Sequence, residues 1–199
     1  MSLIEVERLS KTFARPVRRS GRFAALRSLL AEGFAEVASA GKFRWILHLG
    51  DFSRLIQELP LPSPDAILYD PYSPAVNPEM WTLEHFQNLR RCLSPGTRCL
   101  LTNYTRSTAV RVTLLLGGFF VGRGAGTGEK EETTVAASAC DLLDRPLGSD
   151  WLKRVRGSTN SAPLTGRLGQ RGTINEADLE ALLFHPQFQQ SSKRSKDSA

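Results

Sequence analysis

The sequence predicts an α/β fold in which a mostly parallel sheet is covered by helices in a doubly wound arrangement. Short apolar runs typical of strands alternate with stretches whose apolar residues recur at helical spacing. A glycine-rich, charged connection joins the last two predicted strands, which indicates an antiparallel hairpin at the end of the sheet. With 199 residues, 41% of them hydrophobic, the chain is long enough for one such domain with a real core plus extensions.

The N-terminal part is predicted to hold two strands separated by a helix. Residues 2–7 form the first expected strand and residues 43–49 the second. Between them, apolar residues at helical spacing predict a helix over 23–38, with Gly41 as its stop. Asp51 follows the second strand and is suited to cap the next helix, because its carboxylate can accept from free backbone N–H groups.

Asp70 ends a short apolar run, residues 66–68, and begins a loop stiffened by prolines at 71, 74 and 78. We expect a buried strand that delivers this carboxylate to the carboxyl edge of the sheet, where open α/β proteins bind their ligands. The stiff loop would then hold Tyr72, Asn77 and Trp81 in one arrangement. The alternative is an irregular connection after a strand, with Trp81 as a core anchor.

The rest of the chain continues the alternation of strands and helices. Strands are expected over 97–103, 119–123 and 133–137, and helices over 82–93, 105–116, 150–158 and 173–184. Tyr104 lies at the carboxyl end of its strand, on the same edge as Asp70. The connection 122–130 is not a phosphate-binding loop, because a strand and not a helix follows it.

The composition bounds the partners and the compartment. A net charge of +6 is compatible with a polyanionic partner. Six cations between Lys11 and Arg27, uninterrupted by acidic residues, either neutralise RNA phosphates or form a solvated helix face. The three cysteines show neither a C-x-x-C pair nor metal-ligand spacing, so we expect reduced thiols and no metal. Without a membrane-length apolar run, the chain is predicted to be cytoplasmic and not membrane-bound.

The stretch 70–81, which reads D-P-Y-S-P-A-V-N-P-E-M-W, resembles the signature of MnmC-like methyltransferases. Val6-Glu7-Arg8, Leu49-Gly50-Asp51-Phe52 and the segment 151–158 resemble further elements of the family, and 124–130 does so loosely. The resemblance implies a class I, Rossmann-like methyltransferase fold, S-adenosylmethionine as cofactor and tRNA as substrate. The reaction it implies is N-methylation of an aminomethyl group on a wobble uridine, of the 5-methylaminomethyl-2-thiouridine type.

The resemblance also implies roles for particular residues. Asp70 is the expected catalytic residue, which orients the cofactor or the acceptor amine and takes or steers a proton. Glu7 is expected to bind ribose and Asp51 the adenine amino group. The full set of expected cofactor-binding residues is Glu7, Gly50, Asp51, Phe52, Asp70 and Pro71. The expected substrate-binding residues are Tyr72, Ser73, Asn77, Trp81 and Tyr104, with the two aromatic loop residues stacking on the base.

One element of the family has no match in this sequence. Class I methyltransferases carry a glycine-rich turn after their first strand, and nothing before Glu7 supplies it. We therefore expect a sheet without its first strand, in a standalone methyltransferase that lacks a flavin-binding half; a truncated form is favoured over a degenerate relative. The expected organisation is a methyltransferase-like domain over 1–158, an extension with one helix over 159–188 and a disordered tail over 189–199.

Two other functions compete with tRNA methylation. The first is a catalytically inactive or truncated scaffold that binds RNA, which the missing glycine turn favours and the retained Glu7, Asp51 and Asp70 oppose. Salt-sensitive RNA binding without cofactor binding would identify it. The second is methylation of a protein or a small molecule, because one fold can host many acceptors.

Overall fold

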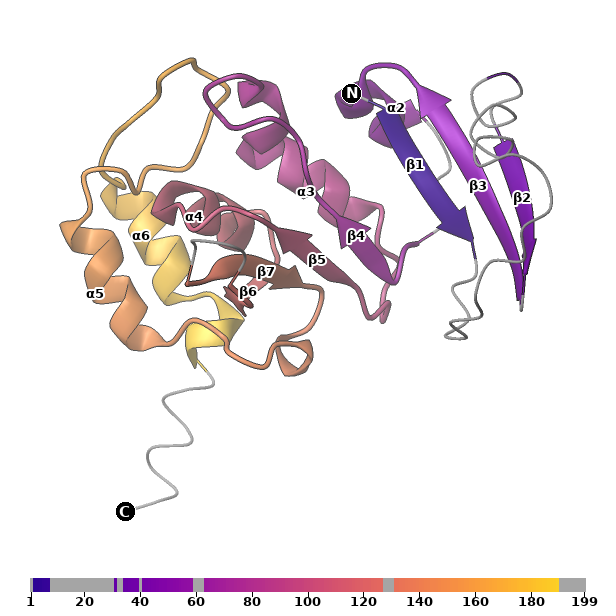
Figure 1. The fold of residues 1–199 in the computed structure, drawn as a ribbon. Helices are drawn as coiled ribbons and strands as arrows, with labels where there is room; N and C mark the ends of the chain where they lie inside the picture. The colour runs from indigo at the N-terminus through magenta and orange to yellow at the C-terminus, as the bar shows by residue number, and fades with distance from the viewer. Residues whose placement is uncertain are drawn as a thin grey trace. The chain divides into compact units, whose positions relative to one another are not determined.

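The computed structural model describes residues 2–7, 31, 34–39, 41–58, 63–126 and 131–189. The chain forms two compact units, Met1–Leu59 and Pro60–Ala199, each with its own sheet (Figure 1). The boundary between them falls inside the segment 1–158, for which the sequence suggests one domain. The cations between Lys11 and Arg27, and the expected tail beyond Gln189, lie outside the described residues.

The Met1–Leu59 unit is built on an antiparallel sheet with the strand order β1-β3-β2. Its elements are β1 (Ser2–Glu7), β2 (Phe34–Ser39), β3 (Gly41–Leu49) and α2 (Phe52–Glu58). In the register of the sheet, Ser2 lies opposite Leu49 and Glu7 lies opposite Arg44. The strands expected over 2–7 and 43–49 are confirmed, but their antiparallel pairing differs from the parallel sheet that the sequence suggests.

The helix expected over 23–38 is wrong for its last residues, which belong to β2. Phe34 pairs with Ile46 and Ser39 with Gly41, so Gly41 opens β3 and does not end a helix. A short run of apolar residues fits both helical and extended spacing, and pairing with a neighbouring strand decides between them. Here the nine-residue β3 provides that partner strand.

The Pro60–Ala199 unit has a mixed sheet of four strands in the order β4-β5-β7-β6. Its strands are β4 (Ala66–Leu68), β5 (Leu100–Asn103), β6 (Phe120–Gly124) and β7 (Thr133–Ala137). The first two are parallel, and the last two form the antiparallel hairpin that the sequence predicts. This sheet, together with its helices, confirms the α/β fold class.

Helices surround this sheet. They are η1 (Pro78–Trp81), α3 (Leu83–Arg91), α4 (Thr108–Leu116), η2 (Cys140–Leu142), α5 (Ser149–Gly157) and α6 (Glu176–Leu183). Thr82 caps α3, since its hydroxyl oxygen accepts from the backbone N–H of His85 at 3.0 Å. Helix α4 is apolar almost all round and packs against α3 and α6, so it lies in the core. Within the described part of the chain, no helix is both long and apolar enough to cross a membrane.

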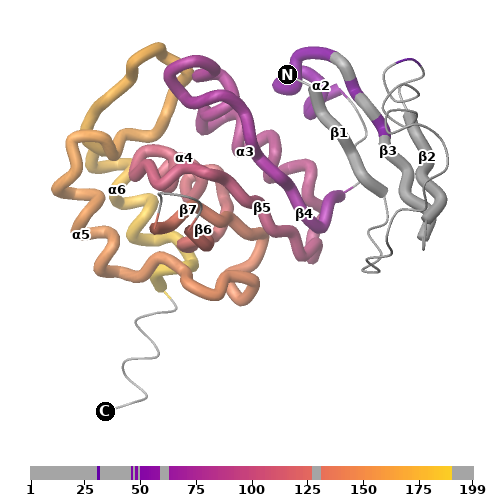
Figure 2. Tube along the Cα trace, viewed as in Figure 1, coloured from indigo at the N-terminus to yellow at the C-terminus, as the bar shows by residue number. Residues whose placement is uncertain are grey.

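The C-terminal segment is part of this unit and covers the edge of its sheet. The trace in Figure 2 passes from α5 through a long loop to α6, and Trp151 stacks on Phe188 with ring centroids 6.5 Å apart. The buried side chain of Gln187 accepts from the N–H of Val121 in β6 at 2.7 Å. Its amide also donates to the carbonyls of Val121 and Leu147, both at 2.8 Å. The backbone of residues 145–147 also pairs with β6, since the carbonyl of Arg145 accepts from the N–H of Arg123 at 2.8 Å, so Gln187 covers this edge together with that segment.

Cys99 is expected to be chemically inert in the folded protein. Burial, with the Asp65 carboxylate as a smaller contribution and Arg90 opposing, raises the pKa of its thiol to about 11. Because the thiolate is the reactive form, about one thiol in a thousand is ionised at pH 8. Iodoacetamide at that pH should modify Cys140, which is partly exposed, well before Cys99, as read by mass spectrometry of peptides. Equal labelling of both residues in the native protein would contradict this.

Candidate active site

Asp70 lies two residues after β4 and is exposed, at the carboxyl end of the strand as the sequence predicts. The expectation of a buried strand is wrong, because the side chains of β4 are exposed or half-buried. Among the described strands, β4 pairs with β5 alone, so its other edge is open. Leu68, two residues before Asp70, is 84% exposed at this edge. A carboxylate beside an exposed apolar side chain is suited to a ligand that carries a positive charge next to apolar groups.

Asn103 joins the ends of β4 and β5. Its buried amide nitrogen donates to the carbonyl of Tyr69 at 3.0 Å, and its amide oxygen accepts from the N–H of Thr105 at 2.8 Å. Both hydrogen bonds go to backbone, so they fix the paths of two loops at once. The backbone leading into Asp70 is thereby tied to the next loop at the same edge.

The side chains of Trp81 and Tyr104 hold the loop after Asp70 by hydrogen bonds to its backbone. The indole nitrogen of Trp81 donates to the carbonyl of Tyr72 at 2.8 Å, and Trp81 is completely buried. The hydroxyl of Tyr104 donates to the carbonyl of Pro71 at 3.1 Å. Partial burial, and next the negative charge of Asp70, raise the pKa of Tyr104, so its hydroxyl keeps this proton well above neutral pH.

Tyr69 packs on the buried side of the loop. Its ring lies edge-on to that of Trp81, with centroids 5.6 Å apart, and its hydroxyl donates to the carbonyl of Met80. Burial is the main reason that the pKa of Tyr69 is raised well above its usual value, with Tyr104 and Glu79 adding to it. The phenol is thus a fixed donor in a packed aromatic cluster.

The outer part of the loop is a turn whose tip faces solvent. The carbonyl of Ser73 accepts from the N–H groups of Val76 at 2.8 Å and Asn77 at 2.9 Å, and the amide of Asn77 donates to Glu79. Tyr72 is 75% exposed. Of the expected substrate-binding residues, the structure therefore presents Tyr72 outward and Ser73 partly so, while Trp81 supports the loop.

The remaining residues expected to bind the cofactor belong to the Met1–Leu59 unit. Asp51 caps α2, because its carboxylate accepts from the N–H of Ser53 at 2.9 Å, which confirms the capping role. Gly50 beside it is exposed, Phe52 is buried, and Glu7 is the last residue of β1. Their contact with a cofactor held at Asp70 stays a prediction.

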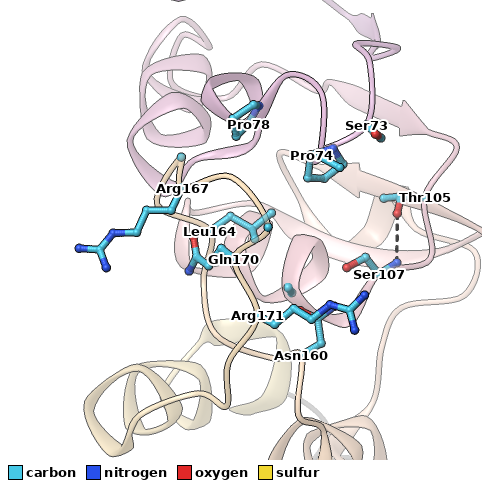
Figure 3. A pocket seen from close by; sticks show the side chains of 14 residues that line it. Ser73, Pro74, Pro78, Thr105, Ser107, Asn160, Leu164, Arg167, Gln170 and Arg171 are labelled. Carbon is cyan, nitrogen blue, oxygen red and sulfur yellow. Dashed lines mark hydrogen bonds between the residues drawn. The ribbon is translucent and has the colours of Figure 1, made fainter.

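A cavity of about 290 Å³ lies beside the loop, between it, the start of α4 and the loop that connects α5 to α6 (Figure 3). Its polar lining includes Ser73, Thr105, Ser107, Asn160, Arg167 and Arg171. Of these residues, Ser73 alone is predicted from the sequence. The signal for the two arginines was the segment 166–172, G-R-L-G-Q-R-G, in which glycines alternate with cations and no acidic residue occurs.

Replacing Trp81 by phenylalanine should loosen the loop while keeping most of the buried ring. The carbonyl of Tyr72 loses its donor, so we expect the free energy of unfolding to fall by about 1 to 3 kcal/mol. A reaction at Asp70 should slow about tenfold, since a less ordered loop positions its side chains less well. The measurements are denaturant unfolding and initial rates.

Trp151→Phe is the matched control for this variant. Trp151 is also buried, but its indole N–H has no hydrogen-bond partner among the residues that the structure describes. We expect this variant to lose less stability and no activity. If both variants reduce activity equally, the hydrogen bond to Tyr72 is not what orders the loop.

The family model for S-adenosyl-L-methionine-dependent methyltransferases matches residues 23–139 of the chain. The chain belongs to this family, and S-adenosylmethionine is its cofactor. The Asp70 loop, which lies between β4 and α3 (Figure 1), falls within this matched part.

Relatives named tRNA 5-methylaminomethyl-2-thiouridine biosynthesis bifunctional protein MnmC are similar to it. The protein from Leptospira interrogans is 33% identical over 116 residues, which is 58% of this chain and 18% of that protein. The protein from Methylibium petroleiphilum is 38% identical over 111 residues, 56% of this chain and 16% of that protein. The crystal structure of MNMC2 from Aquifex aeolicus is 27% identical with a TM-score of 0.49, and the match covers 68% of this chain and 42% of that one. The chain thus spans less than a fifth of these two curated relatives.

Proposed function

We propose that the chain transfers a methyl group from S-adenosylmethionine to an aminomethyl nitrogen on a tRNA wobble uridine, in the cytoplasm. The observation that carries the proposal is an exposed carboxylate, Asp70, on a loop that Asn103, Tyr104 and Trp81 fasten to the sheet edge. The choice of acceptor is supported by the names of the relatives, which refer to the biosynthesis of 5-methylaminomethyl-2-thiouridine in tRNA.

The residues near Asp70 fit the chemistry of the cofactor. S-adenosylmethionine supplies an electrophilic methyl group on a sulfonium, and it also carries an ammonium group. The carboxylate of Asp70 attracts such cations, and the exposed Leu68 offers apolar contact, whereas Pro71, which was also expected to bind the cofactor, is buried. Glu7 would hold the ribose and Asp51 the adenine, with Gly50 and Phe52 beside them.

Asp70 has a second task at the acceptor. An amine attacks only in its neutral form, so a nearby carboxylate helps by accepting the proton that leaves the nitrogen. Orientation of the nitrogen by the same carboxylate supplies the rest of the rate increase.

The loop residues place the base. Tyr72 is exposed and can stack on a base, and Ser73 is partly exposed beside it. Trp81 has no open ring face, so we assign it a positioning role in place of stacking. Tyr104 and Asn77 likewise act through the backbone or the neighbouring side chain that they bind.

The test uses the purified chain, tritium-labelled S-adenosylmethionine and a tRNA whose wobble uridine carries an unmethylated aminomethyl group. We expect label in the wobble nucleoside and none when the same tRNA is already methylated. Cofactor binding by calorimetry with label in a different acceptor would overturn the proposed substrate. Salt-sensitive RNA binding without cofactor binding would instead identify a non-catalytic RNA-binding scaffold.

A further inference from the structure

The cavity beside the Asp70 loop has a lining suited to an anion. Arg167 and Arg171 both line it, and no carboxylate of the described residues does. Hydroxyls of Thr105 and Ser107 and the amide of Asn160 add hydrogen-bond donors. A volume of about 290 Å³ accommodates a phosphate with part of a sugar and lies at the lower limit for a drug-sized ligand.

The loop that carries the arginines is held in place by its backbone. Leu164 accepts from the N–H of Leu83 at 3.0 Å and donates to the hydroxyl of Thr113 at 2.9 Å, so the loop is tied to α3 and α4. The carbonyl of Gly172 accepts from the N–H groups of both Ser161 and Ala162 at 2.8 Å. A ligand therefore meets a wall that is already ordered, and little conformational entropy is lost on binding.

Gln170 shapes the tip of this loop. Its amide oxygen accepts from the N–H of Thr165 at 2.8 Å and its amide nitrogen donates to the carbonyl of Pro163 at 2.9 Å. Gly166 and Gly169 have positive φ angles of 85° and 65°, which permit the tight turn between the arginines. On either side of this turn, the side chains of Arg167 and Arg171 point in different directions.

Figure 3 shows that Arg171 extends toward Ser107, whereas Arg167 points away from the other labelled side chains. Of the carboxylates in the described residues, none forms an ion pair with Arg171. Its fork of N–H donors is thus available beside the hydroxyls of Ser107 and Thr105.

We propose that this cavity binds a backbone phosphate of the RNA substrate, with Arg171 as the main ligand and the hydroxyls of Thr105 and Ser107 as supporting donors. The proposal rests on the proposed function, because it names a contact of that same substrate. Ser73 lines the cavity and lies three residues after Asp70, so the two are within about 11 Å of each other. A phosphate held here fixes the strand next to the reacting base.

The experiment measures RNA binding by fluorescence anisotropy without cofactor, over a series of salt concentrations. The probe is a labelled anticodon stem-loop with an unmethylated aminomethyl uridine. For Arg171→Gln we expect affinity about tenfold weaker near physiological salt. The slope of log affinity against log salt should become shallower by about 0.7, the change expected for one lost phosphate contact in a single strand.

Three variants serve as comparisons. Arg171→Lys keeps the charge but not the fork, so it should retain the salt slope and bind with intermediate affinity. Arg167→Gln should have a smaller effect, because that side chain points away. Arg91→Gln, an exposed arginine in the last turn of α3 that does not line the cavity, should match the original chain.

The outcomes separate this proposal from the proposed function. If the original chain binds the RNA and Arg171→Gln binds it with equal affinity and slope, the phosphate site is wrong and the methyltransferase function stands. If Arg171→Gln weakens S-adenosylmethionine binding by calorimetry but not RNA binding, the cavity holds the carboxylate of the cofactor and the proposal is overturned. If the original chain binds no RNA, the tRNA function fails and this site fails with it.

Discussion

Replacing Asp70 by asparagine is expected to lower the rate of methyl transfer by at least about a hundredfold. Asparagine keeps the size of the side chain but can neither attract the cationic cofactor nor accept the amine proton, and a general base contributes about 10²- to 10⁴-fold. Asp70 is exposed, so the fold should be unaffected. Initial rates with labelled cofactor measure the effect, and denaturant unfolding verifies that stability is unchanged.

Asp65→Asn is the matched control, because Asp65 is an exposed aspartate at the opposite end of β4. It should leave the rate of methyl transfer unchanged. Equal loss in both variants would mean that a general change in charge lowers activity. An active Asp70→Asn variant would remove Asp70 from the chemistry.

Gln187→Met is expected to lower the free energy of unfolding by about 2 to 5 kcal/mol. Methionine fills a similar volume but makes none of the hydrogen bonds, so the N–H of Val121 and the carbonyl of Leu147 lose the partner that Gln187 provides. The carbonyl of Val121 keeps the N–H of Leu147 at 2.9 Å, which limits the loss. Urea unfolding followed by circular dichroism measures this change in the free energy of unfolding.

Gln87→Met, on the exposed face of α3, controls for the chemical change itself and should alter stability by less than about 0.5 kcal/mol. A Gln187→Met variant as stable as this control would show that the C-terminal segment does not protect the β6 edge. In that case the buried backbone groups find other partners.

Local patterns in the sequence are sufficient to predict most helices and strands of the Pro60–Ala199 unit. The apolar run before Asp70, the periodic pattern before Gly117 and the glycine-rich connection after Phe120 each determine one element without reference to distant residues. The strand order β4-β5-β7-β6 depends on pairing between distant segments, which spacing along the chain does not predict. β2 pairs with the next strand in the chain, and a helix is predicted there because its apolar residues fit both helical and extended spacing. β1 pairs with a strand that is distant in the sequence, so local patterns do not predict its antiparallel pairing with β3.

The candidate site likewise contains residues that local sequence predicts and residues whose position depends on packing. Asp70 and Tyr72 were found because a strand end and a proline-rich loop are visible in the sequence. For Trp81 the sequence leaves two roles open, a contact with substrate and a core anchor, and the packing of Tyr69 and Phe86 around it decides for the buried position. The loop 158–175, which forms one side of the cavity, is not predicted to line it. This loop has no periodicity and is positioned by single backbone hydrogen bonds, such as those of Leu164.

The two walls of the cavity come from different parts of the chain. Ser73 and Thr105 lie within the part that matches the family model, whereas Asn160 and Arg171 lie after it. The wall that carries the cations can therefore vary between relatives without disturbing the strand that presents Asp70. In evolutionary terms, discrimination between acceptors can change through a peripheral segment while the chemical step is retained. If the chain acts on RNA as proposed, the stretch 160–171 is the place to diversify in order to change the acceptor.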